Sequence, residues 1–418
     1  MRARTTLASA LPLAAAVFCA TMLGGAMAAQ AQGRVTVTQM YITKCEEMGS
    51  CEFRLTCGSG GKEVEMIPAA IATNPETLKI NKQLDLTSFP ATVSCTLFED
   101  DGLFGTTWDE AAKGSLSLKG GGDYELKLEN PEQATVILTL LADSIQSSLT
   151  APSAVAPAGG RAARAAAPRQ FLAVFRKESE PTGHAVVLGL EWPAFEKKVQ
   201  ELAGGGVHPI DVETWVDGGR RLWGGIFRSG ADTSRIITGL EWEKFLEQWE
   251  KLTNNDNVDE QMQLVDLEIY PDKGKNLFVG VYRNGTEMHS LWIGQDRPDF
   301  LRKWQQLVNQ QLRLVDLEIY RAAGGTRNLY AGVFLEAPGG YGIWTGTTWD
   351  QFQQKWAKGS GLWDVETYKE DGKTLYDGVV LGTGTEELPG MLDGPALVAK
   401  WRDMIGKGYR MIHLEVVE

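Results

Sequence analysis

One short motif occurs five times after residue 170, and this repetition limits the possible folds more than any other feature of the chain. The motif has the form Asp-x-Glu within an aliphatic run, with His in place of Asp in the last copy. Its copies begin at Asp211, Asp266, Asp316, Asp364 and His413, at spacings of 55, 50, 48 and 49 residues. A unit of about fifty residues cannot bury its apolar face alone, so neighbouring units must pack together. We therefore expect five tandem units in a curved or closed array.

Two further motifs repeat in the same register. One is a strand-like run with a central glycine, as at residues 277–282, which follows each of the first four acidic motifs. The other has two large apolar residues four positions apart, such as Phe245 and Trp249, and a residue suited to a helix N-terminus precedes them. Each unit thus reads strand, strand, helix, strand. The pattern predicts five β-β-α-β repeats over residues 170–418, in a propeller- or vase-like arrangement.

The first part of the chain has a different pattern. Residues 33–143 contain seven or eight short apolar runs separated by Gly, Asn, Asp or Pro, which is typical of an antiparallel β-sandwich. Residues 144–169 are rich in Ala, Pro and Gly without periodicity and predict a linker. The expected fold class is therefore α+β, with two domains.

The N-terminal segment and the overall charge indicate export. Arg2 and Arg4 precede an apolar stretch at residues 10–23, which predicts a signal peptide over 1–31. No later segment offers about 18 continuous apolar residues, so we expect no transmembrane segment. The net charge of −13 disfavours nucleic acid as a partner. A secreted or periplasmic location follows.

Cysteine usage agrees with an oxidising compartment. After removal of Cys19 with the signal peptide, an even number remains, which predicts two disulfides. Three connectivities are possible, and we favour Cys45–Cys51 with Cys57–Cys95.

The three repeated motifs together resemble the bacterial tandem repeat domain family over about 171–418. In that family, such repeats form the vase- or propeller-like N-terminal module of fungal polyglycine hydrolases, and they also occur in secreted bacterial proteins. The resemblance implies the fold and an extracellular setting. It does not imply the catalytic serine, because no catalytic domain is expected after the repeats. Residues 33–143 are more distantly similar to a C2-type sandwich through the acidic run at 99–102.

The repeated acids are the main candidates for ligand binding. Strand alternation places Asp266, Glu268 and Tyr270 on one face, where acids flanked by aromatic rings could bind cations, sugars or a basic partner. Alternatively, the acids are structural, either pairing with arginines at strand ends or capping backbone N–H groups between units. Second-strand tryptophans are candidates for an exposed platform. The candidate ligand-binding residues are Asp266, Glu268, Tyr270, Asp316, Glu318, Tyr320, Asp364, Glu366, Trp292 and Trp344.

The N-terminal region offers one candidate metal site. Glu99, Asp100, Asp101 and Asp109 could supply oxygen ligands to calcium, as in C2 loops. No other cofactor is indicated.

These observations favour an exported, non-catalytic binding or scaffold protein whose repeats recognise an extracellular protein or carbohydrate. One alternative is a secreted serine-type hydrolase whose site is assembled between repeats from residues distant in sequence. Another is calcium-dependent adhesion through the N-terminal sandwich.

Overall fold

The computed structural model describes residues 32–44, 51–72, 76–100, 108–130, 134–147, 168–179, 182–230, 232–255, 257, 260–337, 339–356 and 359–417. The predicted signal peptide, Cys45 and most of the expected linker lie outside these residues. Strands make up 63% and helices 18% of the structure, so the protein is mostly β and the expected α+β class is wrong. The physical reason is that each repeat carries one short helix beside three strands.

The N-terminal region forms one strongly curved sheet, a half-barrel, rather than the expected two-layer sandwich. Strand β8 pairs antiparallel with both β7 and β1, and β1 pairs with β4. The path of the sheet then continues from β7 through β6, β5 and β2 to β3. The strands are β1 (Gln32–Lys44), β2 (Cys51–Ser59), β3 (Lys62–Ala72), β4 (Glu76–Leu86), β5 (Ala91–Asp100), β6 (Trp108–Leu118), β7 (Gly122–Asn130) and β8 (Ala134–Ser147).

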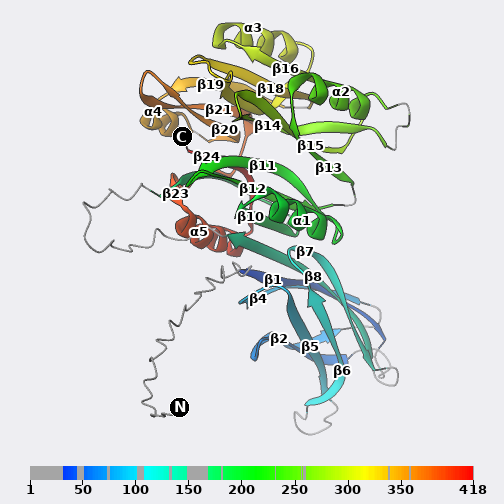
Figure 1. Cartoon of the computed structure of the whole chain (residues 1–418). Helices are drawn as coiled ribbons and strands as arrows, with labels where there is room; N and C mark the ends of the chain where they lie inside the picture. Colours follow the sequence, from blue (N-terminus) through cyan, green and yellow to red (C-terminus); the bar gives the residue numbers. More distant parts are fainter. Residues whose placement is uncertain are drawn as a thin grey trace, which may run out of the picture.

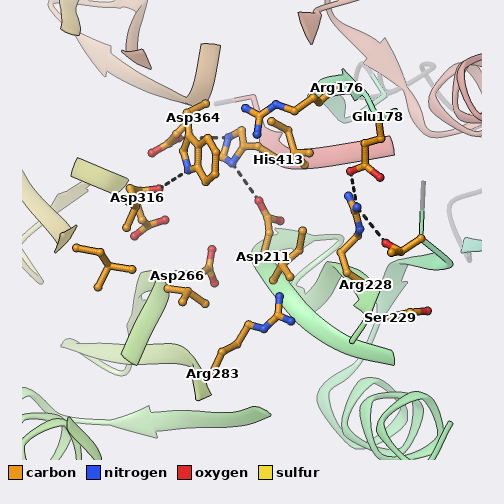
Figure 2. A pocket seen from close by; sticks show the side chains of 17 residues that line it. Arg176, Glu178, Asp211, Arg228, Ser229, Asp266, Arg283, Asp316, Asp364 and His413 are labelled. Atoms are coloured by element: carbon orange, nitrogen blue, oxygen red, sulfur yellow. Dashed lines mark hydrogen bonds and ion pairs between the residues drawn. The ribbon is translucent and has the colours of Figure 1, made fainter. Parts of the chain in front are cut away.

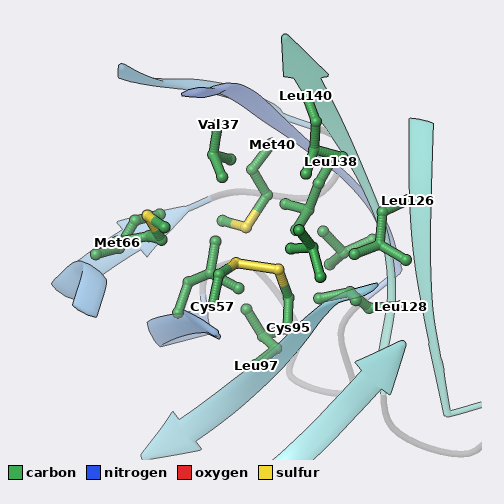
Figure 3. Close-up of a cluster of buried hydrophobic side chains, with 14 of the residues drawn as sticks. Val37, Met40, Cys57, Met66, Cys95, Leu97, Leu126, Leu128, Leu138 and Leu140 are labelled. Carbon is green, nitrogen blue, oxygen red and sulfur yellow. A yellow bond between two sulfur atoms is a disulfide. The ribbon is translucent and has the colours of Figure 1, made fainter. Parts of the chain in front are cut away.

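The concave side of this sheet encloses an apolar core. Val37, Met40 and Leu138 are fully buried there. The core also contains the Cys57–Cys95 disulfide, which joins β2 to β5 (Figure 3). This half of the predicted disulfide pairing is confirmed. Cys45 and the side chain of Cys51 lie outside the described residues.

The half-barrel continues directly into the repeat region. The last residues of β8, 143–147, pair in parallel with β10 (His184–Leu190). Residues 144–147 therefore extend a strand instead of beginning a linker. A single eleven-stranded sheet thus spans both halves of the chain.

Three of the sheets in the repeat region have three strands each, and in each of them a helix follows the first strand in the sequence (Figure 1). In the second sheet, for example, the order in space is β13-β15-β14. The folding unit is therefore shifted by one strand from the expected β-β-α-β repeat, because the short strand before each helix pairs with the glycine strand that follows the acidic strand, as β13 does with β15. We number the units I to V.

The elements of the units are as follows. Unit I contains β10, α1 (Trp192–Ala203), β11 (Val207–Asp217) and β12 (Arg220–Ser229); unit II contains β13 (Ser234–Leu240), α2 (Trp242–Thr253), β14 (Met262–Asp272) and β15 (Lys275–Asn284); unit III contains β16 (His289–Gln295), α3 (Arg297–Val308), β17 (Leu312–Arg321) and β18 (Asn328–Glu336); unit IV contains β19 (Gly342–Thr347), α4 (Trp349–Trp356), β20 (Ser360–Glu370) and β21 (Lys373–Thr383). Unit V contains β22 (Glu386–Glu387), β23 (Leu392–Asp393), α5 (Gly394–Gly406), β24 (Tyr409–Val416) and β9 (Gln170–Lys177).

Unit V joins the beginning of the repeat region to its end. Strand β9 pairs antiparallel with β24, with Phe171 opposite Val416. The acidic strands β11, β14, β17, β20 and β24 contact one another in a complete cycle. Units I to V therefore form a closed ring, with these five strands innermost.

A glycine under each of the helices α1 to α4 explains the central glycine of the second motif. A Cβ atom on Gly280 would lie 2.9 Å from Cζ of Phe245, and one on Gly332 would lie 3.0 Å from Cζ of Phe300. Both phenylalanines are fully buried. Because a contact this close excludes any side chain, the glycine lets the helix lie directly on its sheet.

Candidate ligand-binding site

Every inner strand carries a β-bulge immediately before its acidic motif. The pairing register shifts at Ile210, Val265, Val315, Trp363 and Ile412. A bulge inserts an unpaired residue and turns its side chain in a new direction. All five bulged residues line one cavity of about 410 Å³ at the end of the ring where the aspartates lie, which we call the aspartate cavity.

The aspartates link neighbouring units. Oδ2 of Asp316 accepts the backbone N–H of Leu267 in unit II at 3.0 Å, and Oδ2 of Asp364 accepts that of Leu317 in unit III at 2.6 Å. Asp266 and Asp211 accept equivalent bonds from Val212 at 3.2 Å and Leu414 at 3.1 Å. This is the capping arrangement between units that the sequence left open as a structural alternative.

His413 occupies the fifth position of this layer. Its Nδ1 lies 3.0 Å from Asp211 Oδ2, and its Nε2 lies 3.4 Å from Asp364 Oδ1 (Figure 2). Burial disfavours the charged form of the His413 imidazole, but the carboxylates of Asp364 and Asp211 outweigh this effect and raise the pKa of His413 to about 10. His413 is therefore a cation at neutral pH, placed between two carboxylates.

Asp266 and Asp316 differ from the other two aspartates. Within the described parts of the chain, no Lys, Arg or His nitrogen lies within 4.0 Å of either carboxylate. Burial and then neighbouring carboxylates raise the pKa of each well above the ordinary value. These two carboxyl groups therefore resist ionisation in this cavity, and a neighbouring cation would favour their charged form.

The rim of the cavity is asymmetric. Units V, I and II contribute Arg176, Arg228 and Arg283, whereas unit III presents Leu335 at the same position. The arginines pair with rim acids, not with the repeated aspartates. Arg176 Nε bonds Glu386 at 2.6 Å, Arg228 pairs with Glu178, and Arg283 Nε bonds Asp232 at 2.5 Å.

Trp363 breaks the pattern of bulged residues, since the other four are Ile or Val. Its Nε1 donates to the backbone carbonyl of Val315 at 2.9 Å. The guanidinium of Arg176 lies 4.6 Å from the centre of its ring system. Trp363 therefore gives unit IV an aromatic wall that faces the arginine side of the rim.

Three buried polar atoms at this cavity lack both a hydrogen-bond partner and an ion-pair partner in the described parts of the chain. They are Asp211 Oδ1, Arg228 Nε and Ser229 Oγ. Buried polar groups are normally satisfied, because an unpaired one costs about 1–3 kcal/mol. One acceptor and two donors are thus available to a ligand.

The opposite end of the ring has its own cavity, of about 360 Å³, lined by the five repeated glutamates. Glu318 accepts the N–H of Ile269 at 3.1 Å, and Glu415 accepts that of Thr367 at 2.8 Å. Burial is the largest cause that raises the pKa of Glu268 to about 8 and that of Glu415 to about 7. We call this the glutamate cavity.

The structure divides the predicted binding residues between these two ends. Asp266, Asp316 and Asp364 line the aspartate cavity, whereas Glu268, Glu318, Glu366, Tyr270 and Tyr320 line the glutamate cavity. The four aliphatic wall residues Ile210, Val265, Val315 and Ile412 were not predicted as site residues, because nothing in an aliphatic run signals a bulge.

Trp292 and Trp344 lie outside both cavities. They are half-buried on β16 and β19. Lysine side chains lie over them: Lys303 Nζ is 3.5 Å from the Trp292 ring centre, and Lys355 Nζ is 6.0 Å from that of Trp344. The structure does not bring these tryptophans together with the repeated acids.

The predicted calcium residues remain without a structural account. Asp101 lies outside the described residues, as do the side chains of Glu99, Asp100 and Asp109. Among the described side chains, no group of three or more His, Cys, Asp or Glu is arranged to hold a metal ion.

One histidine has a serine partner. His208 Nδ1 lies 2.9 Å from Ser234 Oγ, where β11 meets β13. A serine triad also needs a carboxylate on the other ring nitrogen, and no such bond to His208 is found among the described residues. His184 instead bonds Asp143 and Trp401, at 2.9 and 3.0 Å.

Comparison with known proteins supports the repeat. Residues 291–337 match the family model of the polyglycine hydrolase-like structural repeat. The match runs from β16 to just beyond β18, which is the strand-helix-strand-strand unit III of the structure. No curated protein matches the chain.

Several solved structures are similar to this chain at a low level. The first C2 domain of plant extended synaptotagmin 1 has 11% identity and a TM-score of 0.20, over 28% of this chain and 95% of that domain. A C2 domain-containing protein from a putative elicitor-responsive gene has 12% identity and a TM-score of 0.20, over 27% and 90%. Human GIVD cytosolic phospholipase A2 has 10% identity and a TM-score of 0.21, over 68% of this chain but only 37% of the enzyme.

None of the described helices is long and apolar enough to cross a membrane.

Proposed function

We propose that this is an exported, non-catalytic binding protein whose ring recognises an extracellular protein or glycan ligand in the aspartate cavity. The observation that carries the proposal is the cavity itself, which is lined from all five units and contains buried polar atoms without partners. Its volume of about 410 Å³ falls in the range of small-ligand and side-chain sites. The Cys57–Cys95 disulfide supports an oxidising compartment.

We also propose that all five units belong to the family whose model matches unit III. The support is topological. Units II, III and IV share one strand order, and each has a bulge at the same place in its inner strand. Units I and V keep the bulge and the inner strand, although unit I joins the half-barrel and unit V is composed of both ends of the repeat region.

The proposal is tested by filling the cavity. Trp363 shows that a bulge position accepts tryptophan, so Val265→Trp is expected to fold and to occupy the aspartate cavity. Val216→Trp is the matched control, because Val216 is 48% exposed and lines the glutamate cavity. The full exported chain is incubated with an array of soluble glycans and short peptides.

We expect the wild type and Val216→Trp to bind the same glycans or peptides on the array, and Val265→Trp not to bind them. All three proteins should have the same unfolding temperature. Binding that survives in Val265→Trp would show that the aspartate cavity is not the site. An array on which the wild type retains nothing would also contradict the proposal.

A further inference from the structure

We infer that the aspartate cavity takes the basic side chain of a peptide, with its cationic group held between Asp266 and Asp316. This inference rests on the proposed function and assigns a ligand class to the same site. It follows from the distribution of charge around the ring, from the polar atoms left unpaired and from the apolar wall beside the two aspartates.

The charge argument begins with His413. The aspartate layer has four carboxylates and one cation of its own, and His413 lies beside only Asp211 and Asp364. Asp266 and Asp316 belong to adjacent units on the other side of the ring. A ligand cation placed between them would stabilise the ionised form of both carboxyl groups and would offset the repulsion between them.

Both carboxylates are buried and available. Asp266 is 7% exposed and Asp316 is 8% exposed. One oxygen of each accepts a backbone N–H, and no donor to the second oxygen is found among the described residues. Figure 2 shows both side chains turned towards the space enclosed by the inner strands. Two such oxygens can accept hydrogen bonds from one ammonium or guanidinium group.

An independent observation indicates more than a simple ion. Asp211 Oδ1 is buried without a partner, and Asp211 is only 3% exposed. Arg228 Nε and Ser229 Oγ are unpaired donors at the rim. A peptide backbone offers both an N–H and a carbonyl oxygen, and it can satisfy groups of both kinds at once.

The wall next to the two aspartates is apolar. Val265 and Val315 precede Asp266 and Asp316 on the bulges, and Leu335 replaces the rim arginine in unit III. Lysine and arginine side chains cover apolar surface with their methylene stems and keep the charge at the tip. This wall therefore favours a basic peptide side chain over an amino sugar, whose polar hydroxyl groups surround the amine.

The experiment uses Nα-acetyl-L-lysine amide as the probe and the full chain as the protein, with calorimetric titration. We expect binding by the wild type and at least about tenfold weaker binding by Asp266→Asn and Asp316→Asn, because each removes one charged acceptor. Asparagine keeps the oxygen that accepts the backbone N–H, so both variants should retain the wild-type unfolding temperature or exceed it. Glu268→Gln and Glu318→Gln remove the same charge from the same strands at the glutamate cavity and should bind as wild type.

Two further probes define the chemistry. The Nε-acetylated form of the same probe is neutral and is expected not to bind. Glucosamine tests the amino-sugar source of an ammonium group and is expected to bind more weakly than the lysine probe. Glucosamine binding in preference to the lysine probe would overturn the assignment to a peptide.

The inference fails if the lysine probe does not bind the wild type at millimolar concentration, if its acetylated form binds equally, or if the two Asn variants bind as well as the wild type. These outcomes do not contradict the proposed function if Val265→Trp still fails to bind the glycans or peptides that the wild type binds on the array. Loss of the proposed function is recognised separately, by array binding that Val265→Trp does not change.

Discussion

His413 Nδ1 lies 3.0 Å from Asp211 Oδ2, and this ion pair joins the last inner strand of the ring to the first. The adjacent backbone N–H of Leu414 bonds the same oxygen at 3.1 Å. The two contacts close the cycle of bonds between units at the seam between units V and I. The residue that departs from the repeated motif is therefore the one that holds the seam.

Replacing His413 by the residue of the other four motifs should weaken the ring. His413→Asp places a fifth carboxylate between Asp211 and Asp364 and removes their cation. Because this leaves buried charges without a partner, we expect a loss of about 3 kcal/mol or more in the free energy of unfolding. Urea denaturation measures it. An unchanged or higher stability would contradict the role of His413 as the cation of the layer.

The backbone bonds of the aspartates predict different effects for two substitutions at one position. Asp316→Asn keeps an oxygen for the N–H of Leu267 and should be close to neutral in stability. Asp316→Ala leaves that buried N–H unpaired and should cost about 1–3 kcal/mol. Thermal unfolding of both variants checks this expectation. Equal stability of the two would show that the bond between units contributes little.

The ring should lose stability as the pH rises. The folded-state pKa of Glu415 is about 7 and that of Glu268 about 8, against an ordinary value of 4.5. Each carboxyl group holds its proton in the folded state when the unfolded chain has lost it. Stability therefore falls from about pH 4.5 up to the folded pKa, by at most about 1.4 kcal/mol per pH unit for each group.

His413 acts in the same direction over a higher range. Its folded-state pKa of about 10 exceeds the ordinary 6.5, so its contribution is complete below pH 6.5 and is lost as the pH rises towards 10. Denaturant unfolding between about pH 5 and 9 should show a continuous decline. Glu268→Gln removes one titrating group and should flatten it. A stability that rises over this interval would contradict the assignment.

The junction of the half-barrel with the ring depends on a buried histidine. Trp401 Nε1 donates to His184 Nε2 at 3.0 Å, while His184 Nδ1 bonds Asp143 on β8. Burial lowers the pKa of His184 to about 4, so its imidazole is neutral and Nε2 can accept the hydrogen bond from Trp401. Trp401→Phe leaves Nε2 unpaired and should cost about 1–3 kcal/mol.

Trp249 provides the matched control for that variant. It holds the same helical position in unit II as Trp401 in unit V, but it is only half-buried and contacts the edge of His289. Trp249→Phe should therefore cost less than Trp401→Phe in the same thermal unfolding experiment. Equal losses would indicate that packing, and not the bond to His184, accounts for the effect of Trp401.

Removal of the Cys57–Cys95 disulfide should destabilise the half-barrel. Cys57 and Cys95 are 38 residues apart, and a crosslink over a loop of that length stabilises by about 3–4 kcal/mol. The double variant Cys57→Ala, Cys95→Ala should destabilise the N-terminal region. We expect faster hydrogen exchange of the backbone amides of β2 and β5 than in the wild type. Unchanged protection of these strands would contradict this expectation.

Much of the repeat could be predicted because its cues are local. The spacing of Phe245 and Trp249 predicted a helix, and the structure has α2 from Trp242 to Thr253. The same motif predicted a capping residue before each helix. Asp296 and Asp393 lie there and accept the backbone N–H of Asp299 and Ala396, whereas Glu191 and Glu241 make no such side-chain bond.

The grouping of strands into sheets could not be predicted in the same way. Sequence repeats have no intrinsic starting point, and the unit boundary depends on which strand lies next to β9 at closure. The site could be predicted only in part. Asp266 and Asp316 were identified from alternation, but alternation assumes regular pairing, and the bulges at Val265 and Val315 that shape the cavity interrupt it. The role of His413 was missed because a single departure in the last copy is equally typical of drift.

Because β9 and β24 are partners, the two ends of the repeat region are held together by backbone bonds, although about 240 residues lie between them. A growing or translocating chain that has reached unit IV still leaves Phe171 and Phe175 of β9 uncovered. Completion of the ring must therefore wait for synthesis of β24, and protection of β9 from exchange should appear only after that point. The same pairing places Phe171 opposite Val416, so a short connection between β24 and β9, with a new opening in a loop between two units, would leave the strand pairings of the ring unchanged.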